Sequence, residues 1–256
     1  MKPETLGFGT CDVRVRLWDV EYILDLLNSY PISQIAHLTS LEPVKRIDNV
    51  MSDSLLRQTV DLIARYYDNF KVGYVGHEGY RKSTDLLKFA RCIDELVRLD
   101  LIDPKRTLFI DLGCGDGRVN VLMSYFVKLS IGIEIDSEIL AEYNRRKEEL
   151  GHKLQRTNLI QPIDNITLFL GNSLEATTYE QIESTINVRF EEIDIFYTYI
   201  TLHDLFGAKI AEKAKPKALY LVYGFNKILP HYQGLKLLIP DLASQGIVTL
   251  YGKSEF

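Results

Sequence analysis

The sequence predicts an α/β protein in which helices cover both faces of a doubly wound, mostly parallel sheet of seven strands. Short apolar runs alternate with helical segments from residue 107 onward, and a glycine-rich turn directly follows the first run. Near the end of the chain, two further apolar runs lie too close together in sequence to be parallel neighbours. These observations together predict the parallel sheet and an antiparallel C-terminal strand.

The N-terminal part of the chain carries helical periodicity instead. Apolar residues recur at helical spacing over 56–67 and over 86–97. Pro31 and Pro43 interrupt an earlier helical segment that starts near Asp19. We therefore expect a helical N-terminal appendage over residues 1–72, which serves as a substrate-recognising cap or an oligomerisation surface, and a sheet domain over residues 73–256.

The strands of the sheet domain are expected over 107–112, 130–135, 166–170, 193–200, 218–223, 235–239 and 247–251. The first five runs are apolar on both faces, which is typical of parallel strands covered by helices on both sides. The last two are separated by seven residues that include Pro240 and Gly246. A parallel pair needs a crossover of about a dozen residues, so this connection predicts a hairpin.

Composition narrows the class of protein. The 256 residues are 46% hydrophobic and 25% charged, which is typical of a folded globular chain. Lys and Arg number 30 against 35 Asp and Glu, and the net charge of −5 without a basic block disfavours sequence-independent nucleic-acid binding. The three cysteines form no CxxC pair, so we expect neither disulfides nor a metal site. The longest apolar stretch, residues 219–225, is far shorter than the ~20 residues of a membrane span, and we expect a cytoplasmic protein.

The glycine-rich turn carries the strongest functional signal. It reads Phe-Ile-Asp-Leu-Gly-Cys-Gly-Asp-Gly-Arg over residues 109–118. Glycines let the backbone approach a ligand, and the helix start that follows offers N–H groups, so the turn is typical of a nucleotide-like cofactor site. The dinucleotide fingerprint is GxGxxG, whereas this turn is GxGxG, preceded by Asp111.

Two further strand ends carry polar residues in the same order. Glu134 lies 23 residues after Asp111, where a carboxylate can accept both ribose hydroxyls. Asp136 precedes a helical segment and is expected to be its N-cap. Asn172 and Ser173 follow the third strand, where either can cap the next helix, and the Asn172 carbonyl can also accept a hydrogen bond from a ligand.

This ordered set resembles the class I S-adenosylmethionine-dependent methyltransferases, which have a Rossmann-like seven-stranded sheet, and the resemblance covers about residues 73–252. It implies S-adenosyl-L-methionine as the cofactor and a methyl-transferring enzyme. In the family the acid of the first motif is linked to the amino group of the ligand, and the loop embraces its methionine part. The implied cofactor-binding residues are Asp111, Gly113, Cys114, Gly115, Gly117, Glu134, Ile135, Asn172, Ser173 and Tyr74.

The residues in and after the fourth predicted strand bear on the identity of the methyl acceptor. The chain lacks the Pro-Pro element of amide and base methyltransferases and the Pro-Cys nucleophile of pyrimidine methylation. Residues 196–200 and 217–225 resemble the small archaeal and mitochondrial protein-lysine methyltransferases, which implies a protein lysine amine as acceptor. Two alternatives stay open: a small-molecule or RNA methyltransferase on the same fold, and a non-catalytic S-adenosylmethionine-binding sensor.

Candidate catalytic residues lie at the end of the same strand. Tyr197 and Tyr199, with Tyr74 and Phe225, are expected to form an aromatic slot that desolvates a lysine and so lowers its pKa. His203 is a candidate base or substrate contact. The alternative for His203 is an exposed position in a capping box over residues 201–204.

Overall fold

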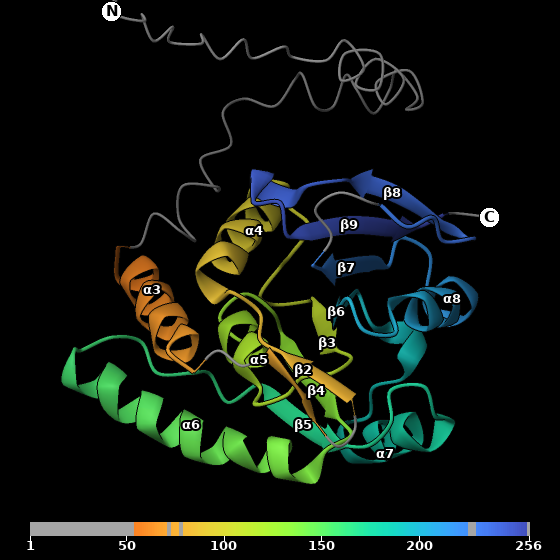
Figure 1. Ribbon diagram of the computed structural model, residues 1–256. Coiled ribbons are helices and arrows are strands. Elements are labelled where there is room, and N and C mark those ends of the chain that lie inside the picture. The colour runs from red at the N-terminus through yellow and green to blue at the C-terminus, as the bar shows by residue number, and fades with distance from the viewer. Residues whose placement is uncertain (1–53, 71–72, 77–78, 225–228, 255–256) are drawn as a thin grey trace, which may run out of the picture. The chain divides into compact units, whose positions relative to one another are not determined.

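The computed structural model describes residues 54–70, 73–76, 79–224 and 229–254, and these belong to one compact unit that extends from Ile47 to Phe256. Figure 1 shows the sheet with helices packed around it. The elements are α3 (Ser54–Asp68), β1 (Gly73–Gly76), β2 (Gly79–Lys82), α4 (Leu86–Arg98), β3 (Leu108–Asp111), α5 (Arg118–Met123), β4 (Leu129–Glu134), α6 (Ser137–Arg156), β5 (Ile166–Leu170), α7 (Ala176–Ile186), η2 (Phe190–Glu192), β6 (Ile195–Tyr199), α8 (His203–Lys213), β7 (Leu219–Tyr223), β8 (Leu235–Ile239), η3 (Leu242–Ser244) and β9 (Val248–Lys253).

The main sheet has seven strands in the order β5-β4-β3-β6-β7-β9-β8. Strands β3 to β7 pair in parallel, whereas β9 pairs antiparallel with both β7 and β8. The predicted fold class is therefore confirmed, including the hairpin at the end of the chain. The strand order reverses between β3 and β6, and this switch point is where open α/β sheets bind their ligands.

Alternate side chains of the strands enter two separate cores. Ile195 and Tyr197 of β6 join the core with α3, α4, α5 and α6, while Phe196 joins the core with α7 and α8. Successive side chains of a strand point to opposite faces, so a run that is apolar at every position needs a helical layer on each side. This is why the apolar runs of the sequence form covered strands.

The helix α3 lies within the range 1–72 that the sequence assigned to an appendage. Its buried residues Leu56, Ile63 and Tyr67 belong to the same core as α4, α5 and the sheet. The helix therefore packs as part of the sheet unit. The remaining residues of the expected appendage, 1–53, lie outside the described residues.

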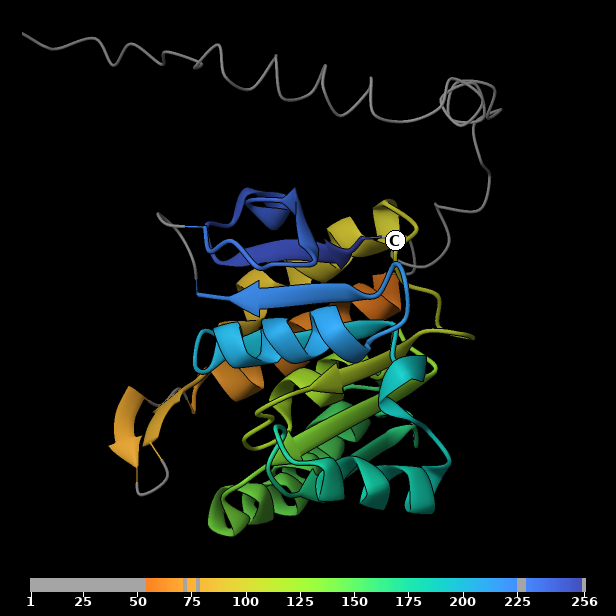
Figure 2. The ribbon, with the colours of Figure 1, turned by 90° about the vertical axis from the view of Figure 1, so that its right-hand side faces the viewer.

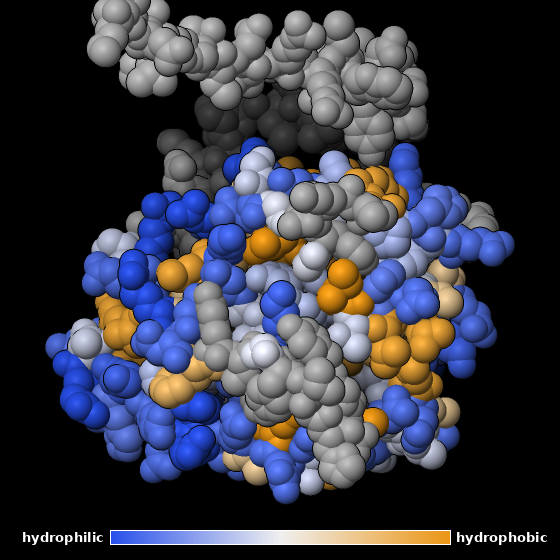
Figure 3. Space-filling view, viewed as in Figure 1, coloured by the Kyte–Doolittle hydropathy of each residue, from blue (hydrophilic) through white to orange (hydrophobic). Residues whose placement is uncertain are grey.

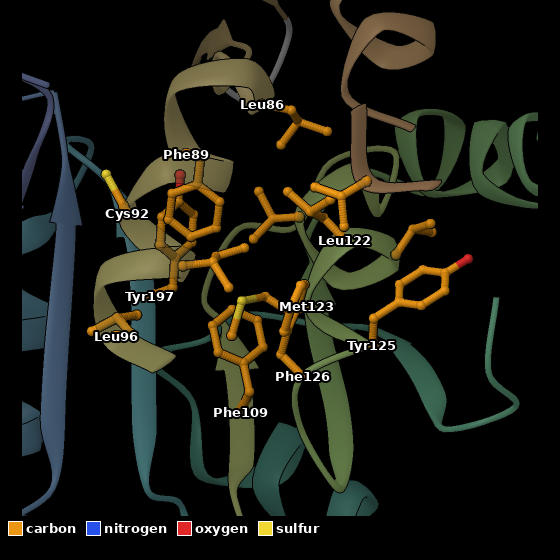
Figure 4. Packing of buried hydrophobic residues seen from close by; sticks show 14 of the residues in the cluster. Leu86, Phe89, Cys92, Leu96, Phe109, Leu122, Met123, Tyr125, Phe126 and Tyr197 are labelled. Atoms are coloured by element: carbon orange, nitrogen blue, oxygen red, sulfur yellow. The ribbon is translucent and has the colours of Figure 1, made fainter. Parts of the chain in front are cut away.

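Figure 4 shows how α4 covers β6. Tyr197 packs edge-on against Phe89 of α4, with 5.1 Å between ring centroids, and lies 6.3 Å from the ring of Phe109 in β3. All three side chains are almost completely buried. This packing fixes α4 over the first half of β6 and leaves the end of the strand, at Tyr199, less covered.

A small hairpin precedes the sheet, and sequence reasoning did not predict it. Strands β1 and β2 pair antiparallel, with Gly73 opposite Lys82 and Gly76 opposite Gly79. Figure 2 shows the hairpin beyond the C-terminal ends of the parallel strands, where the switch point lies.

None of the described helices is long and apolar enough to cross a membrane.

Candidate active site

A pocket opens at the C-terminal ends of β3, β4 and β6, under the chain that links β2 to α4. The described residues that line it are Lys82, Ser83, Thr84, Asp111, Leu112, Gly113, Cys114, Gly115, Asp116, Arg118, Val119, Glu134, Ile135, Asp136, Ile139, Tyr197, Thr198, Tyr199, Thr201, Leu202 and Phe206. The structure thus brings the glycine-rich turn, the second acid and the fourth-strand tyrosines to one cavity.

The three loop glycines have different structural reasons. Gly113 is exposed to the pocket, and a Cβ added there would meet no atom within 4 Å. Gly117 has φ +72°, and its Cβ would lie 2.6 Å from the ring of Tyr143. Gly115 has φ +57° and an open neighbourhood. Gly117 is therefore needed for the fold, whereas Gly113 leaves space for a ligand against the backbone.

Asp111 ends β3 beneath the pocket and is only 2% exposed. Within the described part of the chain its carboxylate accepts one hydrogen bond, from Gly113 N–H at 3.3 Å, and forms no ion pair. Burial raises the pKa of Asp111 well above its usual range, and the negative charges of Glu134 and Asp116 raise it further. A buried carboxylate without a cation is costly, so this position favours a ligand that brings a positive charge.

Glu134 ends β4 and holds two turns together. Its Oε2 accepts from Gly115 N–H at 2.8 Å, and its Oε1 accepts from the N–H groups of Ile135 and Asp136 at 2.9 and 3.0 Å. A carboxylate offers about four lone-pair sites, so three are already used. One lone-pair site of this carboxylate therefore remains for a further donor, such as a hydroxyl.

Asp136 is the N-cap of α6, as predicted, because its Oδ1 accepts from the N–H groups of Glu138 and Ile139. At the third strand end the capping alternative is wrong. Asn172 Oδ1 accepts from Leu174 N–H at 2.9 Å, and Ser173 Oγ donates to the Leu112 carbonyl at 3.0 Å.

Helix α7 begins later, with Glu175 as its N-cap, so neither Asn172 nor Ser173 caps it. Neither residue is among the described residues of the pocket wall, and both stabilise the turn that follows β5.

The remaining cofactor candidates occupy distinct positions. Cys114 is buried, its N–H donates to the Ile133 carbonyl, and burial raises the pKa of its thiol well above the usual range, so it contributes wall and not a nucleophile. Ile135 is 50% exposed at the pocket rim. Tyr74 lies in β1 opposite Arg81, and its side chain is outside the described part of the structure.

A buried ion pair supports the loop, and the sequence analysis missed it. Arg118 donates from Nε and Nη2 to the two carboxylate oxygens of Asp116, at 2.9 and 2.8 Å. The same guanidinium donates to the carbonyls of Tyr67 and Phe70 at 3.4 and 3.1 Å. The pair therefore connects the glycine-rich turn to the end of α3. The sequence signal that could have predicted this ion pair is the presence of two charged residues in the tight Gly-Asp-Gly-Arg turn.

The far wall of the pocket is aromatic. Tyr199 is half-buried at the end of β6, and its ring lies 5.0 Å from that of Tyr223 on β7. The Nζ of Lys82 lies 5.9 Å from the centroid of the Tyr199 ring. The structure thus places a primary ammonium near an aromatic face inside the pocket, within the range of a cation–π contact.

The other catalytic candidates are less accessible. Tyr197 is 2% exposed, its hydroxyl shares a 2.6 Å hydrogen bond with Thr84 Oγ1, and burial raises its pKa well above the usual range. This geometry makes Tyr197 a packing residue of the pocket floor. Phe225, the fourth member of the expected slot, lies outside the described residues, as do residues 77 and 78.

His203 is half-buried, and its Nδ1 is 2.7 Å from the Tyr232 hydroxyl, away from the described pocket wall. Burial lowers its pKa. The expected capping box is wrong, because the N-cap of α8 is Leu202 in the left-handed conformation, with no side-chain cap.

The sheet order and the site together decide the type of fold. The glycine-rich turn follows the central strand β3, an acid ends the neighbouring β4, and one antiparallel strand, β9, completes seven strands. The chain has a class I methyltransferase fold. Its Rossmann-like core carries the candidate site at the switch point between β3 and β6.

Solved structures of methyltransferases are similar to this fold. One is an RNA methyltransferase from Salinibacter ruber in complex with S-adenosyl-L-homocysteine, at 16% identity and a TM-score of 0.45 over 69% of this chain and 95% of that chain. Another is a putative methyltransferase from Escherichia coli, at 15% identity and a TM-score of 0.44 over 69% and 90% of the two chains. A third is an rRNA methylase from Streptococcus thermophilus, at 12% identity and a TM-score of 0.41 over 65% and 95%.

No protein-family model matches the chain, and no curated protein sequence matches it.

The rim of the pocket is apolar beside β6 and α8, where Figure 3 shows hydrophobic side chains gathered. Ile200, Leu202 and Leu205 are 36%, 49% and 48% exposed in this region. The carboxylates of the pocket lie on the opposite side, at the ends of β3 and β4.

Proposed function

We propose that the protein is an S-adenosylmethionine-dependent methyltransferase and that its acceptor is the side-chain amine of a lysine in a protein. The observation that carries the cofactor assignment is the buried Asp111 carboxylate beside the open Gly113 backbone. S-adenosylmethionine brings an α-ammonium group, which supplies the positive charge that the position favours. It also brings a methyl group on a sulfonium, which is already activated for transfer.

The residues of the loop divide the work of binding. Asp111 would accept hydrogen bonds from the ammonium, and Gly113 would let the methionine part lie against the backbone. Glu134 would accept from a ribose hydroxyl at its remaining lone-pair site while it holds Gly115 and the turn at Ile135. The Asp116–Arg118 pair would keep the loop in place from below. We also propose that Cys114 and Ile135 contact the cofactor as parts of the wall and rim.

The acceptor assignment is supported by the aromatic wall. The described residues that line the pocket at the end of β6 are tyrosine, threonine, leucine and phenylalanine, with no carboxylate among them. Transfer then depends on alignment and on a nucleophile that is already neutral. Burial of a lysine against Tyr199 favours its neutral form, because desolvation disfavours the charged amine.

The test has two stages. Calorimetry with S-adenosyl-L-homocysteine checks the cofactor, with Glu134→Ala as the variant expected to lose binding; absence of binding by the parent protein would overturn the whole proposal. Methyl-labelled S-adenosylmethionine is then added to a cell lysate with the protein, and products are separated by protease and nuclease sensitivity. Methyl-lysine in a protein hydrolysate supports the acceptor, whereas label in RNA or in small molecules overturns it.

A further inference from the structure

Lys82 has no place in the cofactor assignment, yet this exposed residue lines the same pocket. It ends β2, lines the cavity together with Gly113 and Tyr199, and is the one lysine among the described lining residues. Its Nζ lies 5.9 Å from the ring centroid of Tyr199. A lysine side chain of the protein therefore extends along the aromatic wall where the proposed acceptor amine would bind.

Tertiary contacts hold this lysine at the pocket. Thr84 Oγ1 shares a 2.6 Å hydrogen bond with the Tyr197 hydroxyl, and Asp85 N–H donates to the Tyr223 hydroxyl at 2.9 Å. Asp85 also caps α4 through Lys88 N–H. The chain just after Lys82 is thus anchored to β6, β7 and α4, which keeps the end of β2 beside the pocket.

We propose that Lys82 is methylated by the active site of its own chain. This inference rests on the proposed function, because it uses the same cofactor and the same aromatic wall. The ammonium of Lys82 first releases a proton to water, and the neutral amine then forms the new N–C bond with the methyl carbon. The methyl–sulfur bond breaks with its electron pair going to sulfur, which leaves S-adenosyl-L-homocysteine and a positively charged methylammonium.

The charge balance of the pocket is compatible with this step. A methylated lysine keeps its positive charge and its contact with an aromatic ring, so the product does not leave an uncompensated group in the pocket. The carboxylates that line the cavity lie at the ends of β3 and β4. The modified side chain would still occupy the acceptor wall.

Mass spectrometry of the full chain tests the proposal directly. Purified protein is incubated with S-adenosylmethionine that carries a deuterated methyl group, and the peptide that contains residue 82 is analysed. We expect the label on Lys82, a rate per molecule that does not change with protein concentration, and no label in Lys82→Arg. Lys88→Arg, a change on the exposed surface of α4, is the matched control and should label normally. A rate that rises with protein concentration would place transfer between copies and overturn the inference.

A second measurement is independent of turnover. An acetylating reagent is applied with and without S-adenosyl-L-homocysteine, and acetylation is compared at Lys82 and Lys88. We expect several-fold protection of Lys82 alone. If S-adenosyl-L-homocysteine binds in calorimetry but Lys82 is not methylated, the inference is overturned and the proposed function still stands. Protection of Lys82 from acetylation in that case would identify it as a cation that contacts the ligand. Failure of the ligand to bind would overturn the proposed function itself.

Discussion

Replacement of Asp111 by Asn should stabilise the unliganded protein and weaken its binding of the cofactor. Asp111 is 2% exposed and has one hydrogen bond of 3.3 Å within the described residues, and burial raises its pKa well above the usual range. The raised pKa means that the unfolded chain ionises this group first. Its contribution to stability is complete below the unfolded pKa of about 3.9 and is lost as the pH rises through the folded pKa. At neutral pH the unfolded chain is ionised at this position, so the burial of Asp111 destabilises the empty site.

The expected magnitudes follow from the surroundings of the carboxylate. Asp111→Asn removes a buried carboxyl group that has few hydrogen bonds. This should raise the free energy of unfolding by about 1–3 kcal/mol, which is the usual cost of burying such a group. For a chain of this size that gain corresponds to an increase of about 2–10 °C in Tm. Loss of one partner of a buried ion pair with the ligand ammonium should cost about 3–5 kcal/mol, on the order of a 10²- to 10³-fold rise in Kd.

Thermal unfolding and calorimetry measure the two effects separately. The Tm difference between Asp111→Asn and the parent should be largest at neutral pH and should shrink as the pH falls toward 4. Asp103→Asn is a control with the opposite sign, because hydrogen bonds from the Lys105 N–H and Arg106 lower the pKa of half-buried Asp103. An Asp111→Asn variant that melts below the parent at neutral pH, or that binds S-adenosyl-L-homocysteine with unchanged Kd, would refute the reasoning.

Three further predictions concern the loop and the aromatic wall. Gly113→Ala should keep the parent Tm in thermal melting but lose cofactor affinity in calorimetry, because an added Cβ meets no protein atom within 4 Å and takes up space at the pocket lining. Gly117→Ala should destabilise the fold by about 2–5 kcal/mol in thermal melting, through left-handed backbone strain and overpacking. Arg118→Met should lower the free energy of unfolding in urea by about 3–5 kcal/mol, because it leaves Asp116 buried and unpaired. The double variant Arg118→Met/Asp116→Asn should recover part of this loss. Equal stability of the single and double variants would contradict the role of the pair. Tyr199→Ala removes a ring worth about 0.5–2 kcal/mol to an ammonium, so KM for a lysine acceptor should rise roughly 2- to 30-fold while Kd for S-adenosyl-L-homocysteine stays the same.

Local rules account for much of the candidate site. The glycine-rich turn, Glu134 at the end of β4 and the N-cap Asp136 were all readable from sequence, because turns, strand ends and caps depend on residues a few positions apart. The parallel strands were readable for a related reason. A run that is apolar at every position is stable only between two helical layers.

Tertiary structure decided the roles of side chains that look alike in sequence. Tyr197 and Tyr199 lie on the same face of β6, but Phe89 and Thr84 cover only the first. The hydrogen bond from Ser173 to the Leu112 carbonyl and the buried contact of Arg118 with the end of α3 likewise join residues that are far apart in the sequence.

The sequence alone thus determined the order of the strands along the chain and the ligand-facing turn, since both follow from local periodicity and backbone sterics. The depth of each tyrosine, the burial of the Asp116–Arg118 pair and the entry of Lys82 into the pocket were decided only by tertiary packing. The physical reason is that burial, and with it the energy of a charge or an aromatic face, depends on which distant elements cover a residue.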